Sequence, residues 1–325
     1  MNRRNVGAVR AIRLPGAATL AIVRGMNAWE PIAAAGATDA GAAFDLRRAV
    51  PDGVAPPTPL VFASPHSGRI YPADMMAASA LDDLAIRRSE DAFVDSLIAA
   101  APALGVATIG ARFARAYIDV NRDALELDPA MFADALPDTV RARTPRVAAG
   151  LGAIARVVSE GQEIYARKLT YAEAAARIDG VHRPYHAALA DLLAEARAAH
   201  GFAILVDWHS MPAAAARSAG RRGGCDMVLG DRFGAACDDG LTALVERGLE
   251  RHGYRVARNA PYAGGYTTEL YGRPARRVHA LQIEINRGLY LEEATLQPTR
   301  GLQKLKGHLE TLIGELVAAD WSALR

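Results

Sequence analysis

The sequence is poor in cysteine, in aromatic residues and in excess charge of one sign. Its 325 residues include only 2 cysteines, Cys225 and Cys237, and 6% aromatic residues. Two cysteines outside any CxxC-type pair exclude a disulfide framework and a structural zinc site of that kind, and they suit a reducing cytoplasm. We therefore expect two buried thiols and a cytoplasmic location.

The charge balance and the hydropathy exclude further classes of protein. A formal net charge of +2 gives no strong attraction to nucleic acid or to a membrane surface. No run approaches the ~18 consecutive apolar residues of a membrane span. With 51% hydrophobic and 23% charged residues, the chain has a globular composition.

The first 25 residues differ from the rest, because they carry five arginines and no acidic residue. Their apolar stretch, Ala17 to Val23, is interrupted by Thr19 and is too weak for a signal peptide. Two interpretations stay open: translation starts at Met1, or it starts at Met26 and the leader is not native. We expect an irregular N-terminal extension over residues 1–50 and a single domain over 51–325.

Short apolar runs alternate with longer helical patterns after the proline-rich segment 51–59, which favours an α/β domain. The expected strands are Leu60–Ala63, Val106–Ile109, Ala116–Val120, Ile204–Asp207, Met227–Leu229 and Leu281–Ile285. The expected helices are Asp82–Ala101, Val157–Tyr171, Val181–His200, Arg232–His252 and Leu302–Ala319. Asp231 is the expected N-cap and Gly253 the stop of the fourth helix. Pro129 to Gly152 fits neither period and is predicted to be a long excursion that could cover a site.

Four of these strands run into polar residues. They lead to His66, to the Asn121-Arg122 pair, to His209, and to Glu284 within the last strand. Ligands of open α/β sheets bind at the carboxyl ends of the strands. These side chains are therefore predicted to share one site.

His66 and His209 are the candidate metal ligands, since a catalytic zinc has three protein ligands and imidazole suits it. The third ligand should be a carboxylate, and the Glu90-Asp91 pair follows His66 at a short distance. Two structural histidines and a solvated acidic pair are the alternative.

Glu284 is the sharpest single candidate. It lies on the polar side of a strand whose other side is apolar, and a buried carboxylate is costly unless it is paired or near a metal. We predict a general base for water activation. An ion pair with Arg122 or Arg287 is the alternative.

The remaining candidates would bind an anionic substrate. A guanidinium grips a carboxylate through two hydrogen bonds, which favours Arg122 with the amide of Asn121 beside it. Further candidates for the same task are Arg69, Arg287, Tyr266 and Thr267, the last two in the glycine-rich Gly264–Thr268 loop. There is no GxSxG, P-loop or HExxH motif, and the GxGxxA match at Gly150–Ala155 follows no expected strand.

Seven of these clusters together resemble the N-formylglutamate amidohydrolase family, in that family's order. They are SPHSGRIYP (64–72), SEDAFVD (89–95), ARAYIDVNRD (114–123), HRPYH (182–186), VDWHSMP (206–212), GGYTTELYGRP (264–274) and HALQIEINRGLYLEE (279–293). The resemblance runs from Leu60 to Glu293.

The resemblance implies a phosphorylase/hydrolase-like, zinc carboxypeptidase-like three-layer α/β sandwich with a central mixed sheet. It implies one zinc ion, or another divalent ion, on His66, His209 and a carboxylate, for which Asp91 matches better than Glu90. Glu284 takes the place of the catalytic glutamate and Asn121-Arg122 that of the carboxylate-binding pair. Arg69 stands where the carboxypeptidases carry a ligand glutamate, so the third ligand must come from elsewhere.

The expected activity is zinc-dependent hydrolysis of an N-formyl or N-acyl amino acid, with N-formylglutamate first. Asn286 and Trp208 differ from what the histidine-degrading members tend to carry, which favours a broader-family member. Other N-acyl amino acids, formamides or short peptides are alternative substrates, and a non-catalytic anion-binding relative is the alternative class. The expected partner is a small anionic molecule, without nucleic acid or membrane, and the oligomeric state is open.

Overall fold

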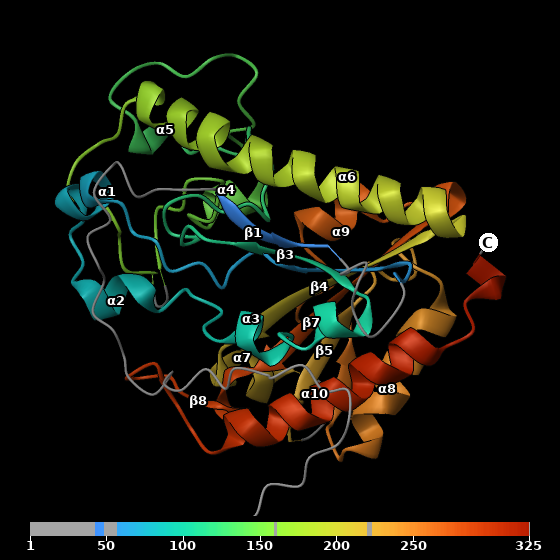
Figure 1. Ribbon diagram of the computed structural model, residues 1–325. Coiled ribbons are helices and arrows are strands. Elements are labelled where there is room, and N and C mark those ends of the chain that lie inside the picture. The colour runs from blue at the N-terminus through green and yellow to red at the C-terminus, as the bar shows by residue number, and fades with distance from the viewer. Residues whose placement is uncertain (1–42, 49–56, 159–160, 220–222, 325) are drawn as a thin grey trace, which may run out of the picture. The chain divides into compact units, whose positions relative to one another are not determined.

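The computed structural model describes residues 43–48, 57–158, 161–219 and 223–324. Seven strands form one mixed sheet in the order β1-β3-β2-β4-β7-β5-β6 (Figure 1). Their bounds are Phe44–Arg47 (β1), Leu60–Ser64 (β2), Ala107–Ala111 (β3), Ala203–Met211 (β4), Met227–Gly230 (β5), Val256–Arg258 (β6) and Val278–Asn286 (β7). A two-stranded ribbon, β8 (Leu291–Glu292) with β9 (Gln297–Pro298), lies outside it.

The middle of the sheet is parallel. Strands β3, β2, β4 and β7 run in one direction, whereas β1 pairs antiparallel with β3 and β5 antiparallel with β7. The carboxyl ends of β2, β4 and β7 therefore meet at one edge, where ligands bind in such sheets.

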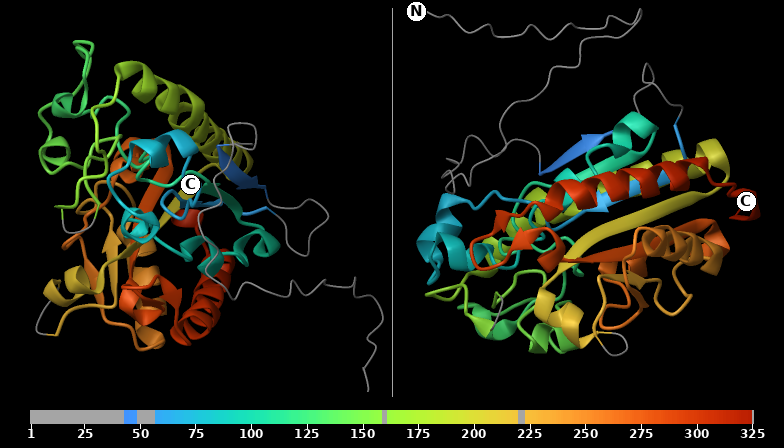
Figure 2. Two further views of the ribbon diagram at one scale, coloured as in Figure 1. Left: turned by 90° about the vertical axis from the view of Figure 1, so that its left-hand side faces the viewer. Right: turned by 90° about the horizontal axis from the view of Figure 1, so that it is seen from below.

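Helices cover both faces of the sheet. The helices are α1 (Ala73–Ala78), α2 (Asp83–Arg87), α3 (Val94–Leu97), α4 (Pro145–Ala148), α5 (Tyr171–Arg177), α6 (Arg183–His200), α7 (Ala213–Ser218), α8 (Asp239–Arg251), α9 (Tyr266–Tyr271) and α10 (Gly301–Ala318). Helix α6 covers one face, and α10, with α8 and α3, covers the other; the view from below in Figure 2 shows α10 lying across its face. The predicted fold class, a three-layer α/β sandwich with a central mixed sheet, is confirmed.

Alternation along β2 shows why both layers are needed. Leu60 and Phe62 belong to the core that includes α10, whereas Val61 and Ala63 belong to the core that includes α6. All five residues of β2 and all nine of β4 are buried. A parallel strand covered on both faces reads as a continuous apolar run, which is how the sequence predicted these two strands.

The strand predicted over Ala116–Val120 is wrong. This segment forms turns, in which Tyr117 N–H and Ile118 N–H both donate to the Ala114 carbonyl and Asp119 N–H donates to Ala153. Ala116, Ile118 and Val120 are nevertheless buried. The alternation reflects burial of a loop against the core, not a ladder of strand hydrogen bonds.

Two predicted helices are also wrong or interrupted. Residues 157–158 and 161–171 pair irregularly with other loops, since Ile164 accepts from Ala80 N–H and Leu169 N–H donates to Met131. The helix predicted over Asp82–Ala101 is broken into α2, α3 and a 3₁₀ turn. The break holds Asp91, whose N–H donates to the His66 carbonyl, and Phe93 there adopts φ 65°.

One helix boundary and the N-terminal extension also differ from the prediction. Asp238, not Asp231, caps the helix predicted from Arg232, because its side chain accepts from Gly240 N–H, while Asp231 organises the preceding turn with Asn259. Within the N-terminal extension expected to be irregular, residues 44–47 form the edge strand β1, and most of the rest lies outside the described residues. Pro129–Gly152 is an excursion, as predicted, and holds a 3₁₀ turn and α4.

The part of the chain that the structure describes contains no helix with the length and apolar character of a membrane span.

Candidate metal centre

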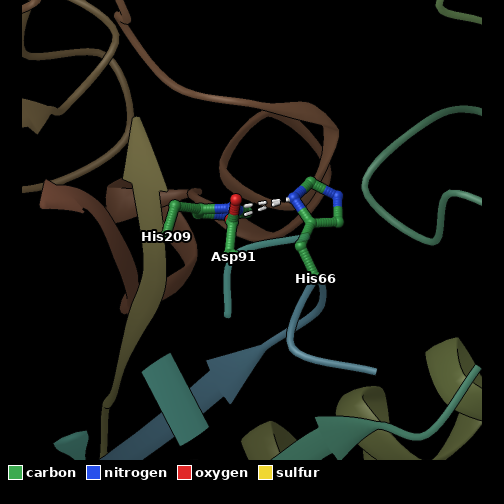
Figure 3. A group of neighbouring side chains, drawn as sticks. All are labelled: His66, Asp91 and His209. Carbon is green, nitrogen blue, oxygen red and sulfur yellow. Dashed lines mark hydrogen bonds and ion pairs between the residues drawn. The ribbon is translucent and has the colours of Figure 1, made fainter. Parts of the chain in front are cut away.

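Three chain segments bring His66, Asp91 and His209 together (Figure 3). His66 follows β2, Asp91 lies between α2 and α3, and His209 lies in β4. Nδ1 of His209 is 3.1 Å from Nδ1 of His66 and 3.1 Å from Oδ2 of Asp91, and Nδ1 of His66 is 3.3 Å from the same oxygen. All three side chains are buried.

The three converging atoms fit a divalent cation. A tetrahedral zinc ion about 2.0–2.1 Å from each ligand separates the ligand atoms by roughly 3.3 Å, close to the spacing observed. Two imidazole Nδ1 atoms that face each other and a carboxylate oxygen are all donors of electron pairs. A positive charge between them removes the repulsion of their lone pairs, so the donor set is the one that zinc prefers.

Carboxylates hold the far side of both imidazoles. Nε2 of His66 is 2.7 Å from Oδ1 of Asp119, and Nε2 of His209 is 3.0 Å from Oδ2 of Asp207. Metal-ligating histidines almost always donate their second ring N–H to such a group, which fixes the tautomer and orients the ring. The sequence reasoning missed both aspartates, although Asp207 lies two residues before His209 on the same side of the strand.

The structure separates Asp91 from Glu90. Oδ1 of Asp91 accepts from Arg287 at 2.8 Å, which leaves Oδ2 toward the histidines. Glu90 points elsewhere, accepting from Tyr71 at 2.7 Å and from Arg87 at 2.8 Å. The residue that matches the family pattern better is therefore the one placed at the candidate centre.

The electrostatics of the site favour positive charge at its centre. Burial raises the pKa of Asp91, but hydrogen bonds from His209 and His66 and the charge of Arg287 outweigh it and hold the pKa well below its usual range. Burial lowers the pKa of His209, yet Asp207, Asp91 and Glu284 raise it well above its ordinary value. The negative charges around His209 therefore stabilise a positive charge at its ring, which either a proton or a metal ion can supply.

Glu284 lies beside this group on the neighbouring strand. Its Cα is the register partner of His209, and its Oε1 accepts from Gln282 Nε2 at 2.9 Å. Burial raises its pKa to about 7, although the charge of His209 acts in the opposite direction. In the part of the chain that the structure describes, Glu284 makes no ion pair with Arg122 or Arg287, so that alternative is wrong. A buried carboxyl with a pKa near 7 suits a general base.

Asn121 sits at the rim of the centre. Its Oδ1 accepts from Thr267 N–H at 2.8 Å, and its Nδ2 is 3.2 Å from Nε2 of His209. Two groups face Nε2 of His209: the amide of Asn121, which can only donate there, and Oδ2 of Asp207, which can only accept. The tautomer of His209 decides which of them bonds to this nitrogen, and substrate binding by Asn121 stays a prediction.

Arg122 is more enclosed than the sequence indicated. Its Nε donates to Leu151 at 2.8 Å, its Nη1 donates to its neighbour Asn121 at 2.8 Å, and its Nη2 is 3.9 Å from Asp119. Burial lowers its pKa, against the charge of Asp119. Contact with a substrate through Nη2 stays a prediction.

Arg287 lies directly after β7, at the edge where the candidate ligands gather. Its guanidinium is buried and donates to Asp91, Ser210 and the Arg88 carbonyl. It therefore holds a candidate ligand, a role that the sequence reasoning did not give it, and contact with substrate stays a prediction.

The other predicted contacts have mixed positions. Arg69 pairs with Asp95 at 2.6 Å and stays partly exposed. Tyr266 is partly buried and lies against His182 and His186. Thr267 is buried, and its hydroxyl has no hydrogen-bond partner in the described structure. Substrate binding by these three residues stays a prediction.

Arg115 is a cation at the site that the sequence reasoning missed. Its Nη2 donates to Asp119 Oδ2 at 2.7 Å, and its side chain is 19% exposed. Burial lowers its pKa, but Asp119, Asp91 and Glu284 raise it, so the guanidinium stays charged. The signal was present, because Arg115 and Asp119 are both in the ARAYIDVNRD cluster, four residues apart.

Comparison with known proteins decides the family. The family model described as N-formylglutamate amidohydrolase matches residues 58–291. The chain belongs to the N-formylglutamate amidohydrolase family. The matched range contains the two histidines, Asp91 and Glu284, and it agrees with the resemblance read from the motifs.

Relatives of this amidohydrolase family cover most of the chain. The N-formylglutamate deformylase from Pseudomonas aeruginosa is 29% identical to this chain, over 72% of this chain and 83% of that protein. The N-formylglutamate deformylase from Pseudomonas putida is 26% identical, over 82% of this chain and 94% of that protein. The crystal structure of N-formylglutamate amidohydrolase from Ralstonia eutropha JMP134 has a TM-score of 0.79 at 40% identity, covering 85% of this chain and 97% of that one. A gene product of Agrobacterium tumefaciens, at a TM-score of 0.54 and 20% identity over 86% and 96%, shares the fold.

Proposed function

We propose that this protein is a zinc-dependent amidohydrolase that cleaves N-formylglutamate to formate and glutamate. The observation that carries the proposal is the convergence of His66, Asp91 and His209 within 4.8 Å, next to the buried carboxyl of Glu284. The names of the relatives support the substrate, since both Pseudomonas proteins are N-formylglutamate deformylases.

His66, Asp91 and His209 would hold the ion. Zinc bound there would supply a Lewis acid that activates water and polarises a carbonyl oxygen. Asp119 lies at Nε2 of His66 and Asp207 at Nε2 of His209, where each carboxylate can accept the ring N–H and leave Nδ1 to the ion. Arg287 keeps the second oxygen of Asp91 occupied, so that one oxygen is free to coordinate.

Glu284 moves the proton. Its carboxylate takes a proton from the attacking water as the water oxygen bonds to the formyl carbon. It then delivers that proton to the amine nitrogen as the C–N bond breaks, which leaves formate and the amino group of glutamate. Gln282 holds one oxygen of Glu284, so the other is available for the transfer.

The substrate carries two carboxylates, and cations must orient them. We assign this task to Arg115 and Arg122, whose guanidinium groups lie 2.7 Å and 3.9 Å from Oδ2 of Asp119, with Asn121 as an amide donor. Fixing the formamide near the water can supply several kcal/mol of the barrier reduction. The alternative substrates are N-acyl amino acids with another acyl group, which present the same amide beside a carboxylate.

Metal content and formate release test the proposal together. We expect about one zinc per chain and formate released fastest from N-formylglutamate in a panel of N-formyl amino acids. Zinc without formate release would keep the hydrolase and redirect the search to other acyl groups. Absence of metal binding after zinc reconstitution would overturn the mechanism and leave an anion-binding protein.

Glu284→Gln tests the base. The amide keeps the size of the side chain but cannot accept the proton, so we expect turnover to fall by at least the ~10²-fold typical of general-base loss. Zinc per chain should be unchanged. Glu310→Gln, an exposed site on α10, is the matched control and should keep full activity. Near-normal rates in Glu284→Gln would show that another group is the base.

A further inference from the structure

We propose that His182 and His186 are positioning residues that hold the Asn121-Arg122 segment against the candidate metal centre. The proposal rests on the proposed function, because it concerns how that site is built. These two residues bound the HRPYH cluster, to which the mechanism above gives no task.

The two imidazoles bind the backbone on either side of Asn121. Nε2 of His186 donates to the carbonyl of Val120 at 2.7 Å, and Nε2 of His182 donates to the carbonyl of Arg122 at 2.8 Å. Both acceptors lie in a segment without strand or helix hydrogen bonds of its own. The two histidines therefore provide the hydrogen bonds that fix this backbone, as neighbouring strands would do in a sheet.

Asn121 transmits this placement to the site. Its Nδ2 lies 3.2 Å from Nε2 of His209, and its Oδ1 accepts the N–H of Thr267 in the first turn of α9. The fit is close, because a Cβ on Gly265 would lie 2.3 Å from Nδ2 of Asn121. A shift of Val120 or Arg122 would consequently move both the amide donor beside His209 and the start of α9.

The local structure explains how the two histidines reach one segment. Pro184 lacks an N–H and would clash with the carbonyl four residues earlier in a regular helix. The helix avoids this clash by forming a π-helix over Ile178–His182. The N–H of Arg183, the residue that follows, donates to the carbonyl of Ile178. His182 and His186 then follow one turn apart on the same side, with ring centroids 4.5 Å from each other.

Aromatic side chains lock the rings. The carbonyl of Val120 can only accept, so Nε2 of His186 carries the proton. The hydroxyl of Tyr271 lies 3.0 Å from Nδ1 of the same ring and donates to the His186 carbonyl at 3.1 Å. Tyr266 packs against both histidines, with centroids 5.4 Å and 6.3 Å away. Since both Nε2 atoms are used on carbonyls, the pair is built to position backbone.

Two substitutions at one position separate positioning from general stabilisation. In His186→Leu the donor is lost at similar bulk, so we expect KM for N-formylglutamate to rise about tenfold, the equivalent of one hydrogen bond, with zinc still at one per chain. His186→Gln places an amide N–H near the original Nε2 and should restore KM to within about threefold of wild type. Leu192→Ala, at a buried position six residues further along α6, destabilises the same helix and should leave KM unchanged.

Amide hydrogen exchange gives a readout that needs no activity. We expect faster exchange at the amides of Asn121 and Thr267 in His186→Leu, and wild-type exchange there in His186→Gln and Leu192→Ala. If these amides are unaffected by His186→Leu, or if Leu192→Ala changes KM equally, positioning by His186 is disproved. A wild-type protein that releases no formate, yet shows the expected exchange pattern, would refute the proposed function and leave the positioning intact.

Discussion

At the scale of single residues, the partner of each charged side chain decides its role at this site. Glu90 and Asp91 are adjacent in sequence, but one binds Tyr71 and Arg87 and the other faces the two histidines. Arg287 was predicted as a substrate contact, and the structure shows it bonded to Asp91. Chemistry at the centre therefore depends on the residues that hold the ligands as much as on the ligands.

Asp207→Asn tests this dependence. The amide keeps the volume of Asp207, but it weakens the acceptor 3.0 Å from Nε2 of His209, so the imidazole becomes a poorer ligand. We expect the zinc dissociation constant to rise about 10- to 100-fold, the usual cost of losing such a partner. Competition with a zinc chelator of known affinity measures it.

The control for Asp207→Asn is Asp239→Asn, at an exposed position paired with Arg258. It should bind zinc as the wild type does. Equal zinc affinity in Asp207→Asn and the wild type would mean that Asp207 does not support His209.

At the scale of elements, the start of α6 links packing to the site. The π-helix at Ile178–His182 and the helix that follows place His182 and His186 over the loop that replaces the predicted strand Ala116–Val120. Burial lowers the pKa of His186 to about 4, His182 lowers it further, and Val120 and Asp123 oppose the shift. The native state therefore favours the neutral ring.

This shift predicts how stability depends on pH. The pKa of His186 is about 4 in the folded protein and about 6.5 in an unfolded chain. The stability that the neutral His186 ring contributes to the folded state is therefore complete above pH 6.5 and is lost as pH falls toward 4. Between pH 7 and pH 5 the free energy of unfolding should fall by about 1–2 kcal/mol more in the wild type than in His186→Gln. Urea unfolding at the two pH values measures this difference. An equal fall in the free energy of unfolding in the wild type and in His186→Gln would contradict the prediction.

At the scale of the whole molecule, the candidate ligands join distant parts of the chain. His66, Asp91 and His209 come from a strand end, an interrupted helix and a second strand. The unfolded chain has no such site, so an ion that binds only the folded protein stabilises it.

Zinc should accordingly raise the unfolding temperature. At free zinc about 100-fold above the dissociation constant, linkage gives about 2.7 kcal/mol of added stability. Thermal unfolding of metal-free protein with and without zinc measures it. Asp91→Asn should lose most of the response, whereas His308→Asn, which alters the stacked pair with His252 at the surface, should keep it. A full response in Asp91→Asn would place the ion elsewhere.

Much of this organisation was readable from local pattern. Strands β2, β3 and β5 and helices α6 and α10 were predicted close to their observed bounds, because continuous or periodic apolar residues reflect burial directly. Strands β4 and β7 were predicted in the right place but extend over nine residues each, beyond the apolar runs. Three site residues could be named because they follow or occupy such strands: His66, His209 and Glu284. Asp91 was named from the family resemblance. The Ala116–Val120 segment was misread, since a buried loop can carry the same alternation as a strand.

The α/β class, the family and the identity of the chemical groups could be read from the amino-acid order, because motif order and hydrophobic period are local properties of the chain. Which atoms meet is visible only in the folded protein. Asp119 and Asp207 behind the imidazoles, Arg287 on Asp91, and His182 and His186 on the carbonyls beside Asn121 are contacts between residues that pattern alone cannot relate. The physical reason is that hydrogen bonds and ion pairs depend on distances of about 3 Å, which folding sets only when the whole sheet and its helices are assembled.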